Sequence, residues 1–182
     1  RVDDALWPPR FTKLRLRFDD GGELVMTNAR RLGRIRLVDD PRTEPPISKL
    51  GFDPLLGMPP LPVFATALAK RRVTIKGLLL NQAFAAGIGN WIADEVLFWA
   101  GIAPAHRAAD LSDVEVSRLH TAIVDVITTA VRVDARKDAF PDDWLFHRRW
   151  GRDAKATTAA GDPLQFDTVA GRTTAWVPAV QR

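Results

Sequence analysis

The sequence has no cysteine among its 182 residues and only three histidines. Without cysteine, disulfide bonds and cysteine-ligated zinc fingers are excluded. The histidines, His106, His120 and His147, are too scattered along the chain to indicate a metal site. No apolar run reaches the roughly 18 residues that a membrane-spanning helix needs. We therefore expect no metal, no cofactor and no membrane partner.

The apolar content is high enough to build a folded core. Hydrophobic residues make up 46% of the chain, which is typical of a globular protein, and 182 residues suffice for one or two small domains. The net charge of +4 and the isoelectric point near 9.9 favour nucleic acid or another anionic surface as partner. The chain starts with Arg1 and shows no signal-like beginning, so we expect that it lacks its start.

The first 40 residues carry the alternating pattern of β-strands. Apolar and charged side chains alternate from Thr12 to Phe18 and again from Glu23 to Thr27, on either side of a glycine-rich turn signal. Arg34 to Val38 has the pattern of a third strand. These segments predict an antiparallel meander over residues 11–39. Because three strands are at the limit of independent stability, we expect more of the sheet before residue 1.

A proline-rich stretch separates this meander from a helical region. Seven of the thirteen prolines lie between Asp40 and Pro62, which predicts a linker because proline breaks both helices and strand ladders. Residues 50–55 are expected to dock onto the helical part. Helices are predicted at 62–70, 75–84 and 88–100. A capping box, Ser112 to Glu115, begins another, whose apolar face is Val116, Leu119, Ile123, Val126, Ile127 and Ala130.

The segment from Ile75 to Pro104 is the most informative part of the chain. Two apolar helical patterns are separated by the small-residue turn Ala85 to Gly89, and Asn90 opens the second helix. The first amides of a helix have no partner inside it and carry partial positive charge, so such a start can hold a phosphate. The same glycines also fit an ordinary tight turn between two helices.

The residues of this segment resemble a known motif. The segments that match are Ile75-Lys76, Leu79-Leu80-Asn81-Gln82, Ala86-Gly87-Ile88-Gly89-Asn90, Ala93-Asp94-Glu95 and Ala100-Gly101-Ile102-Ala103-Pro104. Together they resemble the helix–two-turns–helix motif of the formamidopyrimidine-DNA glycosylase / endonuclease VIII family, which removes oxidised bases from DNA. Asn81 stands where the family usually has aspartate.

The C-terminal residues resemble the finger of the same family. Two short strands are predicted at 164–169 and 173–177, joined by Ala170-Gly171-Arg172. The segment from Gly171 to Pro178 resembles the tip of that finger, and the four zinc-binding cysteines of most bacterial members are absent. Together with the segment from Trp144 to Gly151, it resembles the plant and fungal branch, whose finger keeps its shape without metal. Packing must then hold the strands, and the candidates are Phe166, Val169, Trp176 and Val177.

The resemblance assigns DNA-binding roles to four residues. It implies that Lys76, Gly89 and Asn90 lie at the backbone of the damaged nucleotide, and that Arg172 binds phosphate through its guanidinium fork. The residues taken alone leave other interpretations open. Lys76 and Arg172 fit solvated charges, and Asn90 fits a helix cap.

The turn from Ala29 to Gly33 corresponds to the family segment that fills the hole left by an extruded nucleotide. The resemblance implies that Arg30 faces the orphaned base, that Leu32 is the apolar wedge and that Arg31 contacts the DNA backbone more weakly. The family usually has phenylalanine at the wedge. Taken alone, the segment fits a basic turn.

No catalytic residue is predicted in this chain. The family's nucleophile is its N-terminal proline, closely followed by a catalytic glutamate, and Arg1 to Asp4 do not match that start. Asp94 and Glu95 are adjacent on a helix and point about 100° apart, so they cannot act as paired acid and base. We expect them to make structural or interdomain contacts, and we expect the chain as given to be unable to excise bases.

These inferences give an α+β fold with four parts. Residues 1–40 are the end of a β-sandwich domain, 41–61 a linker, 62–150 the helix–two-turns–helix domain and 151–182 a zincless finger. The resemblance implies part of a bifunctional DNA glycosylase and AP lyase for oxidised purines, bound as a monomer to double-stranded DNA with an oxidised base or an abasic site. The alternative is a non-catalytic lesion- or nucleic-acid-binding protein with the same module. The location would be nuclear in a eukaryote and cytoplasmic otherwise.

Overall fold

The computed structural model describes residues 7–182. The chain divides into two compact units, residues 1–44 and residues 45–182, and each is described by itself. The division falls inside the proline-rich stretch predicted as a linker. Residues 45–61 thus belong to the second unit. Within residues 7–182, none of the helices combines the length and the apolar character that a membrane span requires.

The first unit is built on one antiparallel hairpin. Strand β1 (Thr12–Arg17) pairs with β2 (Glu23–Thr27), with Leu16 opposite Leu24. The turn is closed by Asp20, whose Oδ1 accepts the Gly22 N–H at 2.8 Å. Leu16 and Leu24 are exposed, although the alternation predicted a half-buried face, because the described part of this unit has no second layer to cover them.

The predicted third strand is wrong. Residues 34–38 run as irregular chain, and neither described sheet includes them. Their alternation of arginine with Ile35 and Leu37 satisfies the strand pattern, but a strand also needs a neighbour to accept its main-chain hydrogen bonds. Ile35 is 55% exposed, so the alternation produces no buried face here.

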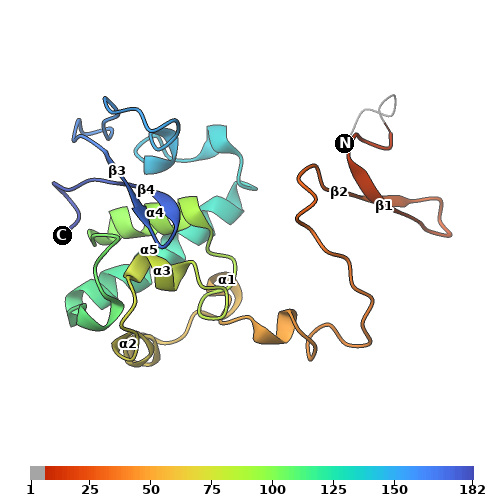
Figure 1. Cartoon of the computed structure of the whole chain (residues 1–182), viewed down its shortest axis with the longest axis horizontal. Helices are drawn as coiled ribbons and strands as arrows, with labels where there is room; N and C mark the ends of the chain where they lie inside the picture. The colour runs from red at the N-terminus through yellow and green to blue at the C-terminus, as the bar shows by residue number, and fades with distance from the viewer. Residues whose placement is uncertain (1–6) are drawn as a thin grey trace. The chain divides into compact units, whose positions relative to one another are not determined.

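The second unit is mainly helical (Figure 1). Its α-helices are α1 (Pro54–Gly57), α2 (Leu61–Ala69), α3 (Ile75–Leu79), α4 (Asn90–Ala100) and α5 (Asp113–Arg132). Short 3-10 helices are η2 (Ile47–Lys49), η3 (Ala108–Asp110), η4 (Lys137–Ala139) and η5 (Leu145–His147). A second hairpin, β3 (Gln165–Val169) and β4 (Arg172–Trp176), closes the unit.

Helix α3 is shorter than the predicted 75–84, because Asn81 redirects the chain into turns. The Asn81 side chain accepts the Ala83 N–H at 3.0 Å, and its main-chain oxygen accepts the Phe84 N–H at 2.8 Å. Gln82 then spans the second turn, accepting from Gly87 N–H at 2.9 Å and donating to Ile88 O at 3.0 Å. Gly87 has φ +87°, a conformation that favours glycine. The two turns delay α4 until Asn90.

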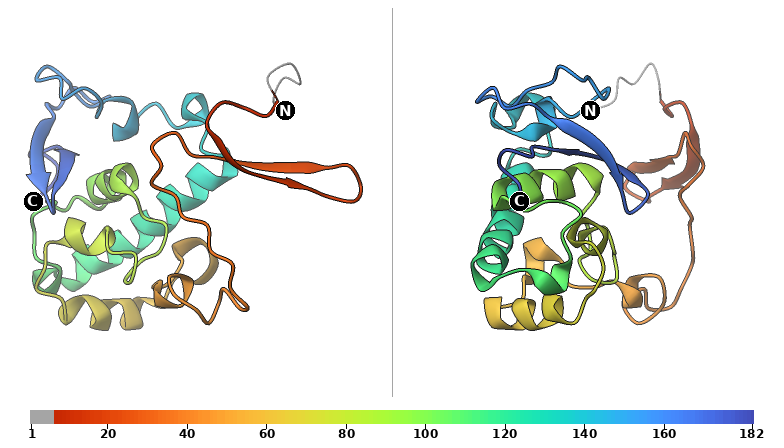
Figure 2. Two further views of the ribbon diagram at one scale, coloured as in Figure 1. Left: turned by 45° about the vertical axis from the view of Figure 1, so that its right-hand side comes forward. Right: turned by 60° about the vertical axis from the view of Figure 1, so that its left-hand side comes forward.

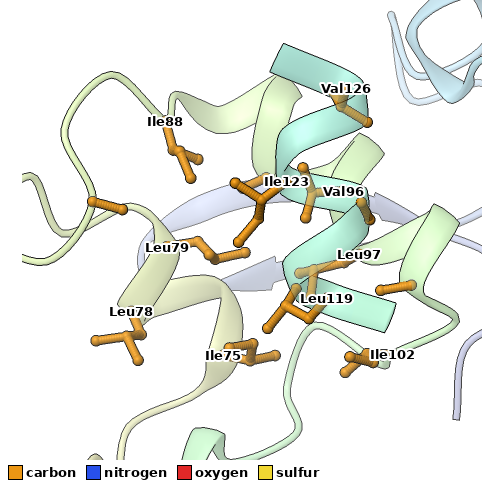
Figure 3. Close-up of a cluster of buried hydrophobic side chains, with 14 of the residues drawn as sticks. Ile75, Leu78, Leu79, Ile88, Val96, Leu97, Ile102, Leu119, Ile123 and Val126 are labelled. Atoms are coloured by element: carbon orange, nitrogen blue, oxygen red, sulfur yellow. The ribbon is translucent and has the colours of Figure 1, made fainter. Parts of the chain in front are cut away.

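The core lies between α3, α4 and α5. Figure 3 shows side chains of these helices meeting around Ile123, with Ile88 of the turn beside them. The capping box of Ser112 and Glu115 begins α5 as predicted. The predicted apolar face of α5 is buried, except that Ile127 is only partly buried.

The segment of residues 50–55 docks onto the helical part as predicted. Gly51 N–H donates to Gln82 O, and Ala86 N–H donates to Phe52 O, both at 2.8 Å. A side chain at Gly51 has no room, since its Cβ would lie 2.1 Å from Phe84 O. The docked segment therefore clamps the outside of the two turns.

The β3–β4 hairpin is the predicted finger, and it lies beside α4 (Figure 2). Its small core consists of Leu145, Leu164, Ala175 and Val177, with Phe166 partly buried against it. Of the four predicted packing residues, Val177 is fully buried, while Val169 and Trp176 are only partly buried. Among residues 7–182, no group of three histidine, cysteine or acidic side chains is placed to hold a metal ion.

Candidate nucleic-acid interface

The start of α4 is open. Its cap position is Gly89, which offers no side-chain oxygen, and the first intrahelical bond runs from Ala93 N–H to Gly89 O at 2.9 Å. The amides of the first turn therefore lack helical acceptors and carry the positive end of the helix dipole. A Cβ at Gly87 or at Gly89 would meet no atom within 4 Å. Another molecule can thus approach this backbone closely.

The alternative interpretation, that Asn90 caps α4, is wrong, because the cap position is Gly89. The Asn90 Nδ2 instead donates to the main-chain oxygen of Thr173 in β4 at 2.8 Å. This bond joins the start of α4 to the tip of the finger. The neighbouring residue, Arg172, is exposed at the first position of β4. The helix start and the backbone of Arg172 are thereby brought into one region of the second unit.

The finger tip also rests on α3. Ala170 and Gly171 turn the chain with φ values of +51° and +70°. A Cβ added at Gly77 would lie 3.2 Å from the Ala170 Cβ, so the tip packs closely over this glycine. The tip is therefore fixed from two sides, by α3 and by Asn90.

Lys76 is fully buried, so the interpretation of Lys76 as a solvated charge is wrong. Its Nζ contacts Asp94 Oδ1 at 2.5 Å, Thr174 Oγ1 at 2.7 Å and Thr173 O at 3.3 Å. Burial lowers the pKa of the Lys76 ammonium, and the Asp94 carboxylate opposes that shift. A DNA phosphate cannot reach this ammonium in the arrangement described.

Asp94 and Glu95 make the structural contacts that were predicted. Asp94 Oδ2 accepts from Arg149 Nη2 at 2.6 Å and from Ala175 N–H at 3.1 Å. Asp94 thereby ties α4 to the finger and to the segment before it.

Glu95 points to a different set of donors. It accepts the main-chain N–H groups of Leu145 at 3.1 Å and Phe146 at 2.8 Å, and the Trp99 Nε1–H at 2.9 Å. Burial raises the pKa of the Glu95 carboxyl to about 7, against these hydrogen bonds. Glu95 thus holds η5 in place and does not face Asp94's partners.

The predicted void-filling residues lie in the first unit. Asn28 shapes their loop, because its Oδ1 accepts the Leu32 N–H at 3.2 Å and its main-chain oxygen accepts the Arg31 N–H at 3.4 Å. Arg31 adopts φ +55° within this turn. Arg30, Arg31 and Leu32 are all exposed, and Leu32 is 72% exposed. An apolar side chain held at the tip of a basic loop has the chemistry of a wedge.

Three residues at the finger make contacts that the sequence patterns do not predict. Thr173 and Thr174 connect the tip to Lys76 and Asn90, and Arg152 Nη2 donates to Thr173 Oγ1 at 2.5 Å. These contacts join residues that are more than 20 positions apart. No local sequence pattern predicts these contacts. The one sequence feature that could have pointed to the threonines is their position directly after Arg172.

The sequence and the fold have clear relatives. Residues 50–141 match the family model described as the formamidopyrimidine-DNA glycosylase H2TH domain. The chain is 46% identical to formamidopyrimidine-DNA glycosylase of Arabidopsis thaliana, covering 99% of this chain and 46% of the relative. It is 33% identical to the Geobacillus kaustophilus protein of the same name, covering 91% of this chain and 64% of the relative.

Solved structures have the same fold. The MutM (Fpg) protein of Thermus thermophilus is 34% identical, with a TM-score of 0.77 over 97% of this chain and 70% of that one. The Lactococcus lactis Fpg in complex with abasic-site DNA is 25% identical, with a TM-score of 0.79 over 95% of this chain and 67% of that one. The chain spans about half to two thirds of the relatives it matches. On this evidence the chain belongs to the formamidopyrimidine-DNA glycosylase family.

Proposed function

We propose that this chain grips damaged double-stranded DNA as part of a bifunctional DNA glycosylase and AP lyase for oxidised purines. The observation that carries the proposal is the Asn90–Thr173 hydrogen bond, because it sets an exposed arginine beside an open helix start. A helix start offers backbone amides to a phosphate, and a guanidinium offers two parallel donors. Gly89, Asn90 and Arg172 would together bind the backbone beside the lesion.

The loop of the first unit that carries Arg30, Arg31 and Leu32 would supply a second set of DNA contacts. An enzyme that acts on a base must take it out of the stack, and an inserted side chain offsets the stacking that is lost. Leu32 would be the wedge and Arg30 would face the orphaned base, with Arg31 on the DNA backbone. Their exposure on a loop shaped by Asn28 supports these roles.

The relatives support the choice of substrate. Solved structures with the same fold include Lactococcus lactis Fpg with DNA that contains an abasic site and with DNA that contains N7-benzyl-Fapy-dG. We extend this to the present chain as duplex DNA with a formamidopyrimidine, a related oxidised purine or an abasic site, bound by a monomer.

The finger would work without metal, as in the plant and fungal branch. The packing of Leu145, Leu164, Ala175 and Val177 gives it a core of its own. Asp94 adds a polar anchor through the Ala175 N–H. These contacts take the place that cysteine-bound zinc has in most bacterial members.

The departure at Asn81 does not favour the alternative of a non-catalytic binding protein. Asn81 Oδ1 accepts the Ala83 N–H, which is the turn contact that an aspartate oxygen would make. Asparagine therefore keeps the geometry of the two turns.

Fluorescence anisotropy tests the proposal. The chain is titrated, in EDTA, with a duplex that carries a stable abasic-site analogue and with the same duplex undamaged, at two salt concentrations. We expect a preference for the damaged duplex, weaker binding at higher salt and no effect of EDTA. Equal and weak binding to both duplexes would contradict the proposed role.

A further inference from the structure

The successive carbonyl groups of Arg172 and Thr173 are both held by side-chain hydrogen bonds. The Arg172 oxygen accepts from Thr174 Oγ1 at 3.1 Å. The Thr173 oxygen accepts from Asn90 Nδ2 at 2.8 Å and from Lys76 Nζ at 3.3 Å. Arg172 O belongs to the peptide unit that follows the Arg172 α-carbon, so its bond to Thr174 restricts the backbone of Arg172 directly, and the bonds to Thr173 O hold the next peptide unit. The chain before Arg172 is the tip that packs over Gly77. Because backbone direction sets where a side chain leaves a strand, these contacts restrict the direction of Arg172.

Lys76 links these carbonyl groups to the interior of the second unit. Its ammonium has three protons, and each has an acceptor inside the protein: Asp94, Thr174 and Thr173. The Thr174 hydroxyl accepts from Lys76 and donates to the Arg172 oxygen. A continuous chain of hydrogen bonds thus runs from the buried ammonium to the main chain of Arg172.

Asp94 anchors the same network to the rest of the unit. Its two oxygens bind Lys76 and Arg149, and Oδ2 also accepts the Ala175 N–H. The network therefore connects α3, α4, the segment before the finger and β4. Groups in two of these elements, the start of α4 and Arg172 of β4, are those we propose to contact phosphate.

We propose that Lys76 is a positioning residue, which directs Arg172 towards the DNA backbone and makes no phosphate contact of its own. This inference rests on the proposed function, and it differs from the role that the family resemblance implied for Lys76. To reach a phosphate, the ammonium would have to leave Asp94 or Thr174 and come out of a fully buried site. Removing one partner from a buried ion pair is strongly unfavourable.

Salt-dependent binding separates a positioning role from a direct contact. The full 182-residue chain is compared as wild type and as the single variants Thr174→Val, Lys76→Met and Arg172→Ala. Two double variants combine Arg172→Ala with Thr174→Val or with Lys76→Met. Affinity for the abasic-analogue duplex is measured by anisotropy over a series of salt concentrations. Each phosphate contact contributes about 0.9 to the slope of log affinity against log salt. Arg172→Ala should therefore lower that slope by about one.

The positioning role predicts strong coupling to Arg172. Thr174→Val keeps the side-chain shape and should weaken binding roughly five- to tenfold, the effect of one lost hydrogen bond of ordinary strength. In the Arg172→Ala background, Thr174→Val and Lys76→Met should change affinity less than about twofold and leave the slope unchanged. Thr168→Val, on the exposed face of β3, and Lys70→Met, at the exposed end of α2, are the matched controls. Thermal unfolding of every variant shows whether it is folded.

Other results would overturn the inference. If Lys76→Met lowers the slope by a further ~0.9 in the Arg172→Ala background, Lys76 contacts phosphate directly. If Thr174→Val matches Thr168→Val in a wild-type background, the hydrogen-bond chain does not position Arg172. If the wild type binds the duplex and Arg172→Ala has no effect, the assignment of Arg172 fails and the inference with it. Failure of the proposed function itself is distinct, since the wild type would then show no preference for the damaged duplex.

Discussion

The carboxylate of Glu95 in α4 accepts the main-chain N–H of Phe146 at 2.8 Å, in a site where both residues are buried. The carboxylate is the better acceptor when ionised, yet burial favours its neutral form and raises its pKa to about 7. The residue that holds η5 in place is thus poised to titrate near neutrality.

Stability should depend on this carboxyl between about pH 4.5 and pH 7. The folded protein binds the Glu95 proton more tightly than the unfolded chain does, so the free energy of unfolding falls as the pH rises through this window. The shift from 4.5 to about 7 corresponds to about 3 kcal/mol in total. Urea unfolding of the wild type and of Glu95→Gln at several pH values measures it. The wild type should lose stability relative to the variant as the pH rises, whereas parallel curves would contradict the shift.

Gly51 should tolerate no side chain. A Cβ at this position would lie 2.1 Å from Phe84 O, a main-chain atom that cannot move without opening the two turns. We expect Gly51→Ala to reduce the free energy of unfolding by about 3 kcal/mol, measured by urea denaturation. Gly57→Ala is the matched control, because a Cβ there meets nothing within 4 Å. Equal stability of the two variants would mean that the docked segment does not clamp the turns.

Leu32 should control lesion preference and leave the salt dependence unchanged. Leu32→Ala removes the apolar group that we propose to enter the gap in the duplex, so affinity for the abasic-analogue duplex should approach that for undamaged DNA. Leu32→Phe should strengthen lesion binding by about 1 kcal/mol, because a flat ring stacks on bases. Anisotropy with both duplexes measures the ratio. An unchanged ratio in Leu32→Ala would remove Leu32 from the site.

The finger should depend on packing and be indifferent to chelators. Val177 is fully buried in its core, and Val177→Ala should cost about 2 kcal/mol of stability through the cavity it leaves. EDTA should leave the melting temperature of the wild type unchanged. Val180→Ala is a suitable control, because Val180 is exposed just beyond the strand. A melting temperature that falls in EDTA would reveal a bound metal.

Features that depend on local patterns could be predicted from the sequence. The capping box at Ser112, the turn at Gly87 and the hairpin at Gly171 each need particular residues at fixed short spacing. The prediction of a third strand was wrong because it used only the local alternation around Ile35, whereas strand pairing depends on residues elsewhere in the chain.

Lys76 shows why part of the site could not be predicted. A lysine beside a helix start is ordinarily solvated, and its burial depends on Asp94, 18 residues away, and on Thr174, 98 residues away. The role of Asn90 likewise depends on Thr173, 83 residues further along the chain. Only the folded chain brings these groups together, because nothing near either residue encodes the partner.

The sharing of one carboxylate by two cations has a consequence for how this protein can change. Losing Asp94 alone would strand two buried positive charges, whereas losing Arg149 alone would still leave Asp94 its pair with Lys76. The order of substitution therefore matters. An engineered or diverging chain that replaces all three charged residues should replace Lys76 or Arg149 before Asp94. A version with apolar side chains at all three positions could remain as stable, but β4 would then be held to α3 and α4 only by the Asn90–Thr173 bond and by packing, such as that of the finger tip over Gly77.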